Sequence, residues 1–280
     1  MTFGSRARVA MQAYGPACIG IDPHSALLEQ WGLPDDVEGL DRFASICVEA
    51  FAGHAAFVKP QSAFFERFGA RGVVVLERTI QDLRHTGSLV ILDVKRGDIG
   101  STAAAYADAY LDDDAPMAAD AITVSPFLGF GSLHPFFEVA DKNDAGVFVL
   151  ALTSNPEGPE VQHARLDGAH VGSGGPTVAG RILSQLSALN DGQTPMGAFG
   201  AVVGATIGGA AENLDINGPL LVPGFGAQGG TVEDIRRLFS GVIDNVIPST
   251  SRAVLSAGPD VGALRDSVAR VNAELTGSNL

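Results

Sequence analysis

Short apolar runs recur along the chain, and stretches with helical periodicity separate them. Runs of this kind are typical of strands that are buried on both faces of a parallel sheet. We predict eight strands on this basis, over Ala17–Asp22, Ala55–Lys59, Leu89–Lys95, Ala121–Ser125, Gly146–Leu152, Phe199–Thr206, Pro219–Pro223 and Asn245–Ser249.

The stretches between these runs have the length and spacing of crossover helices. Eight repeats of a strand and a helix in a chain of 280 residues predict a (β/α)8 TIM barrel. We expect it to form a single domain over residues 1–280, with its active site at the carboxyl ends of the strands. A doubly wound open sheet is the alternative. The helices are expected over Asp41–Ala52, Val73–His85, Ala103–Leu111, Leu133–Lys142, Val178–Leu189, Ala210–Ile216, Thr231–Phe239 and Val261–Leu275.

The third predicted strand ends in an abrupt change from apolar to charged residues. Its apolar part, Leu89–Leu92, is followed by Asp93, Val94 and Lys95. Because side chains alternate along a strand, Asp93 and Lys95 share one face. Buried charges are costly unless they are paired, so this acid and base form either a structural ion pair or part of an active site. The following Gly100–Thr102 offers a capping residue for an alanine-rich helix.

Other predicted strands also end in polar residues. Asp22 ends the first strand, where it could cap the next helix, and Lys59 ends the second, where it could form a salt bridge at the rim. Thr123 and Ser125 end the fourth, and their hydroxyls could bind a ligand or cap the next turn. The carboxyl ends of barrel strands converge, so we expect these side chains to lie near Asp93.

The last two strands are followed by segments suited to phosphate. The stretch Pro223–Thr231 contains four glycines, which free the backbone to approach a ligand and to present N–H groups to it. The eighth strand is followed by Arg252, which is preceded by three hydroxyl residues, Ser249, Thr250 and Ser251. Arg252 could bind a phosphate through two hydrogen bonds, or it could pair with the acidic surface.

The composition narrows the class of protein. A formal charge of −14 argues against general binding to nucleic acid or to anionic membranes, and no apolar run is long enough to cross a bilayer. Cys18 and Cys47 lie in apolar surroundings that suit reduced thiols. No apolar segment follows Arg6 and Arg8, so we expect no signal peptide. We therefore expect a soluble, cytoplasmic protein.

The connection after the fifth strand, residues 154–177, is unusually long and rich in glycine and proline. It is either a flap over the active site or a solvated loop. Two extended runs between Val161 and Val171 flank Asp167-Gly168 and favour a small hairpin. The six histidines show no ligand spacing with each other or with the cysteines, so we predict no metal site.

Several ordered motifs together resemble a known family. Asp93-x-Lys95-x-x-Asp98 resembles the signature of the orotidine 5'-phosphate decarboxylases, and the string DVKRGDIGSTAAAYADAYL is similar to their bacterial subgroup, type 2. The similarity continues through CIGIDPH, FVKPQSAFFE, TVSPFLGFGS, LTSNPEG, VVGAT, LVPGFGAQGG and STSRAVL. The resemblance implies decarboxylation of orotidine 5'-phosphate to uridine 5'-phosphate and CO2 in de novo pyrimidine biosynthesis, with no metal and no cofactor.

The resemblance also implies roles for particular residues. The family's alternating array of lysines and aspartates matches Lys59, Asp93, Lys95 and Asp98. In the family, the last aspartate and the threonine that Thr102 matches reach into the neighbouring subunit's site, which implies a homodimer with shared active sites. The residues that match the family's substrate ligands are Asp22 for the ribose, Ser125 for the pyrimidine, and Gln228 and Arg252 for the phosphate.

The reaction requires a cation at one ring carbon. Loss of CO2 from a 6-carboxypyrimidine leaves a carbanion on C6 with no adjacent carbonyl to accept the charge. We hypothesise that the Lys95 ammonium stabilises this carbanion and then donates the replacing proton. Asp93 and Asp98 would orient Lys95, and Lys59 would hold Asp93.

Three other functions compete with this interpretation. The Asp-x-Lys-x-x-Asp motif also resembles metal-dependent sugar-phosphate decarboxylases of the same barrel type, but those place an acidic ligand where this chain has Lys59, which would repel a divalent cation. A Schiff-base aldolase would need Lys95 as a neutral amine, and two neighbouring aspartates favour the charged form. A nucleotide sensor without catalysis would have no need of an intact four-charge array.

Overall fold

Eight parallel strands pair in chain order and close into a barrel, because β8 also pairs with β1. The computed structural model describes residues 1–166, 175–207, 212–226 and 229–277. The predicted (β/α)8 barrel is confirmed. Its strands are β1 Cys18–Ile21, β2 Phe57–Pro60, β3 Leu89–Arg96, β4 Ala121–Val124, β5 Gly146–Leu152, β6 Phe199–Val203, β7 Leu220–Pro223 and β8 Val246–Thr250.

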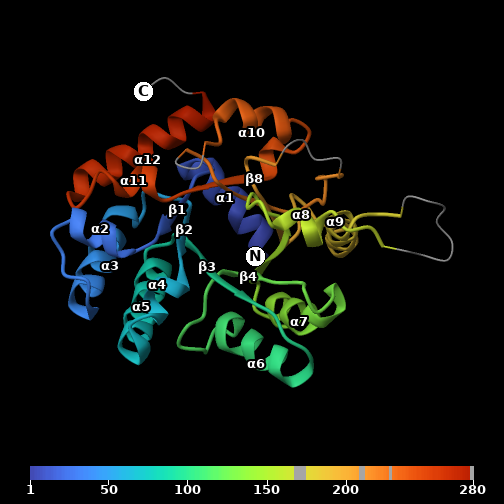
Figure 1. Ribbon diagram of the computed structural model, residues 1–280, viewed down its shortest axis with the longest axis horizontal. Helices are drawn as coiled ribbons and strands as arrows, with labels where there is room; N and C mark the ends of the chain where they lie inside the picture. Colours follow the sequence, from blue (N-terminus) through green and yellow to red (C-terminus); the bar gives the residue numbers. More distant parts are fainter. Residues whose placement is uncertain (167–174, 208–211, 227–228, 278–280) are drawn as a thin grey trace.

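Helices surround the barrel, and α1 lies within their ring in Figure 1. Within the described part of the chain, none of them combines the length and apolar character that a membrane span requires. The α-helices are α1 Phe3–Tyr14, α2 Ser25–Gln30, α3 Val37–Phe51, α4 Ser62–Glu66, α5 Gly69–His85, α6 Gly100–Leu111, α7 His134–Lys142, α8 Gly158–Gln162, α9 Val178–Leu189, α10 Val232–Leu238, α11 Arg252–Leu255 and α12 Val261–Thr276. Two short 3-10 helices are η1 Phe130–Leu133 and η2 Ile243–Asn245.

Alternation along the strands divides the buried core into two layers. Phe57 and Ile91 belong to the cluster inside the barrel, whereas Val58 belongs to the larger cluster between the barrel and the helices. Lys59 and Asp93 lie two residues beyond Phe57 and Ile91, so they continue the inward-facing rows. The period of two therefore carries these two charges to the carboxyl end of the barrel interior.

The amino-terminal helix α1 closes the opposite end of the barrel. Phe3 is fully buried, and its ring meets the ring of Phe148 edge-on, with the centroids 5.9 Å apart. The Arg8 guanidinium donates hydrogen bonds to the carbonyl oxygen of Asp244 and, at 2.5 Å, to Oδ1 of Asn245. The first helix of the chain is thus fixed both to the barrel interior and to the segment that leads into β8.

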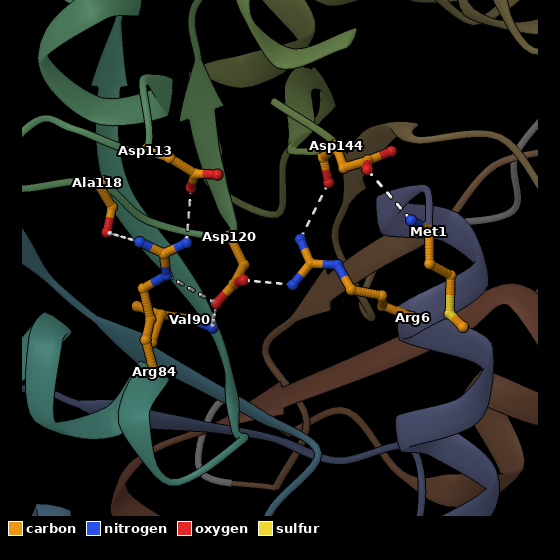
Figure 2. A network of polar contacts seen from close by, with 8 residues as sticks. All are labelled: Met1, Arg6, Arg84, Val90, Asp113, Ala118, Asp120 and Asp144. Carbon is orange, nitrogen blue, oxygen red and sulfur yellow. Dashed lines mark hydrogen bonds and ion pairs between the residues drawn. The ribbon is translucent and has the colours of Figure 1, made fainter. Parts of the chain in front are cut away.

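A buried carboxylate joins α1 to two strands at this end, as Figure 2 shows. Asp120 immediately precedes β4, and its oxygens accept hydrogen bonds from Arg6 Nη1 at 2.5 Å and from the backbone N–H of Val90 at 2.9 Å. Arg84 Nε lies 3.8 Å from the same carboxylate, and Arg84 Nη2 also pairs with the more exposed Asp113 at 2.9 Å. The carboxylate of Asp120 is therefore a partner of an arginine from α1, an arginine from α5 and a backbone N–H of β3.

Replacing Asp120 by alanine should lower the free energy of unfolding by about 3 kcal/mol. The substitution leaves the buried N–H of Val90 without an acceptor and removes the carboxylate partner of Arg6. Asp113→Ala is the matched control, because it removes an exposed partner of Arg84 and should cost less than about 1 kcal/mol. Urea unfolding measures both changes, and equal losses would contradict the role given to Asp120.

One predicted helix is wrong. Within the expected span Ala210–Ile216, the described residues 212–216 are not helical. The Asn213 side chain accepts a hydrogen bond from the backbone N–H of Asp215 at 3.0 Å, which is a local turn that competes with helix formation. Pro219 follows shortly afterwards and leads directly into β7.

Four α-helices of the described residues escaped prediction, and one predicted cap is wrong. The helices that were not expected are α1, α2, α4 and α8. Helix α1 buries a narrow stripe made mostly of small residues, Phe3, Ala7 and Ala10, and such a stripe gives only a weak helical periodicity of hydrophobic residues. Helix α6 begins at Gly100 with Ile99 at its N-cap and has no side-chain cap. The capping residue predicted within Gly100–Thr102 therefore lies inside the helix instead.

The hairpin predicted in the loop after β5 is only partly present among the described residues. Val161 is helical, as the last turn of α8, so the first extended run is wrong. Arg165 and Thr177 form an antiparallel bridge that closes the base of the loop. Asp167 and Gly168, the predicted turn, lie outside the described residues.

Candidate active site

A cavity of about 840 Å³ opens at the carboxyl ends of the strands, where the barrel fold predicts the active site. Its lining comes from all eight strands or the residues directly after them, from the loops after β5 and β7, and from α2, α4 and α11. Five of the predicted site residues line it: Asp22, Lys59, Asp93, Lys95 and Arg252.

Asp93 is the centre of the charged groups on the cavity floor. Its Oδ2 lies 3.0 Å from Lys59 Nζ, and its Oδ1 lies 2.6 Å from Lys95 Nζ. The Thr123 hydroxyl donates a third hydrogen bond to Oδ1 at 2.8 Å. Asp93 is 8 % exposed and Lys59 is 7 % exposed, so both charges are largely removed from water. The carboxylate thus holds two ammonium groups from neighbouring strands.

The two buried charges stabilise each other's ionised forms. Burial alone would raise the pKa of Asp93, but the charges of Lys59 and Lys95, with hydrogen bonds from Lys95 and Thr123, outweigh it and hold that pKa well below its usual range. Burial would likewise lower the pKa of Lys59, and the carboxylates of Asp93 and Asp22 raise it above its usual value instead. The floor of the cavity therefore carries a fixed carboxylate and a fixed ammonium.

Lys95 projects into the cavity because the strand bends there. Its backbone has a φ of +45°, and the pairing of β3 with β4 shifts register between Leu92 and Arg96. The backbone N–H of Lys95 donates to Oγ1 of Thr123 at 3.0 Å, which fixes this conformation. The Lys95 side chain is 46 % exposed, so its ammonium is held by Asp93 on one side and open to a ligand on the other.

Asp22 directly follows β1 and is held by the residue that directly follows β8. Its Oδ2 accepts a hydrogen bond from the Ser251 hydroxyl at 2.5 Å, whereas its Oδ1 is buried without a hydrogen-bond partner among the described residues. The helix cap considered for Asp22 is wrong, because the following helix α2 is capped by His24. The unpaired oxygen leaves Asp22 with capacity to accept a hydrogen bond from a ligand.

Arg252 stands at the rim of the cavity. It is exposed, and no ion pair links it to an acid in the described part of the chain, so the surface pair considered for it is not formed there.

The glycine loop after β7 differs from expectation. The N–H groups of Gly226, Gly229 and Gly230 donate to carbonyl oxygens within that loop, so these three are not presented to a ligand. Gln228 lies outside the described residues.

Three other predicted site residues lie outside the described lining of this cavity. Asp98 is half-buried and accepts a hydrogen bond from the backbone N–H of Ile99 at 2.8 Å, and Thr102 is exposed on α6. Ser125 is half-buried just beyond β4, where its backbone N–H donates to the carbonyl oxygen of Arg96 at 2.7 Å. The hydroxyl of β4 that reaches the charged floor is that of Thr123.

The side chain of Thr123 was expected near Asp93 from its place at the end of the fourth strand, and its hydroxyl does contact that carboxylate. Inward-facing residues of β4 start with Ala121, which belongs to the interior cluster, so a period of two places Thr123 inward. No periodicity in the sequence distinguishes the other polar or aromatic residues of the lining from ordinary loop and helix residues. They are His24, Gln61, Phe64, Thr153, Ser154 and Asn155.

Both cysteines are free and buried, as expected. Burial raises the pKa of the Cys18 thiol to about 12, so this group is protonated beneath the charged floor. Among the described residues, no three His, Cys, Asp or Glu side chains come together as a possible metal site.

Comparison with known proteins gives a consistent family match. The model of the orotidine 5'-phosphate decarboxylase / HUMPS family matches residues 16–267. Orotidine 5'-phosphate decarboxylase of Nocardioides sp. strain JS614 is 62 % identical over 274 residues, which cover 98 % of each chain. The Streptomyces coelicolor enzyme of that name is 57 % identical, covering 98 % of this chain and 96 % of that one.

Solved structures agree with this match. A structure from Streptomyces avermitilis, provisionally assigned as orotidine 5'-phosphate decarboxylase, has a TM-score of 0.95 at 55 % identity and covers 99 % of this chain and 95 % of that one. The OMP decarboxylase structure of Leishmania donovani has a TM-score of 0.72 at 26 % identity, with 99 % and 100 % covered.

Proposed function

The chain belongs to the orotidine 5'-phosphate decarboxylase family, and we propose that Asp93 and the three groups that contact it, Lys59, Lys95 and Thr123, carry out the family's reaction in this barrel. The chain is a carboxy-lyase that converts orotidine 5'-phosphate to uridine 5'-phosphate in pyrimidine biosynthesis. The observation that supports the mechanism best is the Lys95 ammonium, held 2.6 Å from a carboxylate and open to the cavity.

Lys95 is the proposed proton donor. The bond between C6 and the carboxylate breaks and leaves its electron pair on C6, and CO2 departs. The Lys95 ammonium stabilises that pair and then transfers a proton to C6, after which the amine regains a proton from water. Because Asp93 already holds the ammonium in place, little reorganisation accompanies the reaction.

The other buried groups keep this ammonium in position. Lys59 and Thr123 also donate hydrogen bonds to Asp93, and these bonds hold its carboxylate facing Lys95. No metal enters this mechanism, because both oxygens of Asp93 bind ammonium groups and Lys59 repels a divalent cation. This arrangement disfavours the metal-dependent sugar-phosphate decarboxylase that the motif also resembles.

The substrate's outer parts have proposed ligands along the same cavity. The free Oδ1 of Asp22 accepts a hydrogen bond from a ribose hydroxyl, and Arg252 binds the phosphate. Gln228 and Ser125 remain proposed ligands of the phosphate and the pyrimidine. The loop over residues 154–177 contributes Ser154 and Asn155 to the lining and is the proposed flap.

The active unit is proposed to be a homodimer that shares its sites. Asp98 and Thr102 are not among the described lining residues of this chain's own cavity, which supports a role in the site of a second copy. Large apolar side chains stand exposed on the same rim, after β3 and β4: Ile99 at 62 %, Phe127 at 78 % and Leu128 at 55 %. Burial of these side chains by another subunit removes their apolar surface from water. The free cysteines suit a cytoplasmic location.

The test of the function is a direct assay. The purified protein, dialysed against EDTA, should convert orotidine 5'-phosphate to uridine 5'-phosphate, followed by ultraviolet absorbance. Activity that vanishes with the chelator and returns with a divalent cation would contradict the metal-free mechanism. A protein that does not turn over this nucleotide under either condition would overturn the function.

A further inference from the structure

Three consecutive hydroxyl residues lie at the end of β8, the last of them directly after the strand, and their environments differ. Ser249 pairs in register with Cys18, which points into the barrel, and Ser251 donates its hydrogen bond to Asp22. Thr250, between them, is 4 % exposed, and its Oγ1 has no hydrogen-bond partner among the described residues. A buried hydroxyl without a partner costs free energy and calls for an explanation.

The register places Thr250 away from the reacting ring. Thr250 pairs with Ile19, which belongs to the cluster between the barrel and the helices, so its side chain faces outward from the barrel axis. Lys59 and Asp93 face the opposite way, into the barrel interior. Thr250 nevertheless lines the same cavity as these two charges. Its hydroxyl is therefore placed for a peripheral group of the ligand.

The surroundings of Thr250 indicate which peripheral group this is. Arg252, two residues further on, lines the same cavity without an ion pair among the described residues. Gly226 lies beside the hydroxyl, since a Cβ added there would be 3.7 Å from Thr250 Oγ1. An arginine, a glycine backbone and an unused hydroxyl after β7 and β8 form the kind of place at which a barrel binds phosphate. The internal bonds of Gly226, Gly229 and Gly230 leave more of that recognition to side chains.

We propose that the Thr250 hydroxyl is a substrate-binding group that donates a hydrogen bond to the phosphate of the nucleotide, beside Arg252. The inference rests on the proposed function, because it takes the occupant of the cavity to be a nucleotide monophosphate. The Thr250 hydroxyl has no partner among the described residues, whereas Ser249 faces the barrel interior and Ser251 donates to Asp22. Phosphate oxygens are strong acceptors, so binding of the substrate supplies the missing partner.

The test compares two substrates in the nearly isosteric variant Thr250→Val. For orotidine 5'-phosphate, kcat/KM should fall roughly 10- to 100-fold, the effect of losing one hydrogen bond to a charged group. For orotidine, the nucleoside without the phosphate, kcat/KM should stay at the wild-type value. Thr250→Ser retains the hydroxyl and should restore most of the loss. Arg252→Ala is the positive control for a phosphate ligand, and it should likewise affect only the nucleotide.

Thermal unfolding of the ligand-free protein separates binding from structure. Removal of an unsatisfied hydroxyl should leave the Tm of Thr250→Val unchanged or slightly raised. An equal loss of kcat/KM on both substrates, or no loss on either, would overturn the inference. If the valine variant does not fold, Thr250→Ala serves for the same comparison. Absence of turnover in the wild-type protein would count against the proposed function itself, so the two failures are distinguishable.

Discussion

Replacing Lys95 by alanine should reduce the turnover of orotidine 5'-phosphate by roughly four orders of magnitude or more, because one group supplies both the charge that meets the carbanion and the proton that replaces CO2. Nucleotide binding should persist, since Asp22 and Arg252 remain in the cavity. Single-turnover kinetics measure the first effect, and calorimetric titration with uridine 5'-phosphate measures the second.

The chain provides a matched control for this variant. It contains only three lysines, and Lys142 is the one outside the cavity, exposed at the end of α7. Lys142→Ala should retain wild-type kcat and KM. Near-native turnover in Lys95→Ala would remove that ammonium from the chemical step. Loss of nucleotide binding together with turnover would instead make Lys95 mainly a binding group.

Two inactive variants, Lys95→Ala and Asp98→Ala, should recover about one quarter of wild-type activity when they are mixed and allowed to exchange subunits. Each mixed dimer contains one site with both substitutions and one site with neither, if Asp98 serves the neighbouring subunit. At equal concentrations about half of the dimers are mixed, and half of their sites are intact. The assay is initial velocity against the fraction of each variant.

The control for this experiment combines two residues of the same site. Lys95 and Asp93 contact each other within one chain, so a mixture of Lys95→Ala and Asp93→Ala should recover no activity. Exchange of subunits is verified with chains that carry different affinity tags. Exchange without recovery in the Asp98 mixture would show that Asp98 does not complete a neighbouring site, and the shared-site proposal would fail.

The sequence predicted the charged floor because a strand has a strict period. Once Leu89–Leu92 is placed in a buried strand, alternation puts Asp93 on the inner face, and the same rule places Lys59 at the end of β2. Strand positions were accurate for a related reason: the barrel strands are largely buried on both faces, so each contains a short apolar run. β5 matches its predicted span, Gly146–Leu152.

Features set by contacts between distant segments were not predictable in this way. The positive φ of Lys95 depends on the Thr123 hydroxyl, 28 residues away in the chain. Ser251 donates its hydrogen bond to Asp22, at the other end of the chain, whereas the Thr250 hydroxyl has no partner among the described residues. No local pattern encodes such pairings, since they follow from closure of the barrel between β8 and β1.

The position of α1 has a consequence for how the protein is made. This helix is synthesised first, yet Phe3 needs Phe148, and Arg8 needs Asp244 and Asn245. As the nascent chain leaves the ribosome, the segment over residues 3–14 has to wait until nearly all of the polypeptide has followed before it can dock. Docking of this amino-terminal helix onto residues near the carboxyl terminus is therefore a late step of folding.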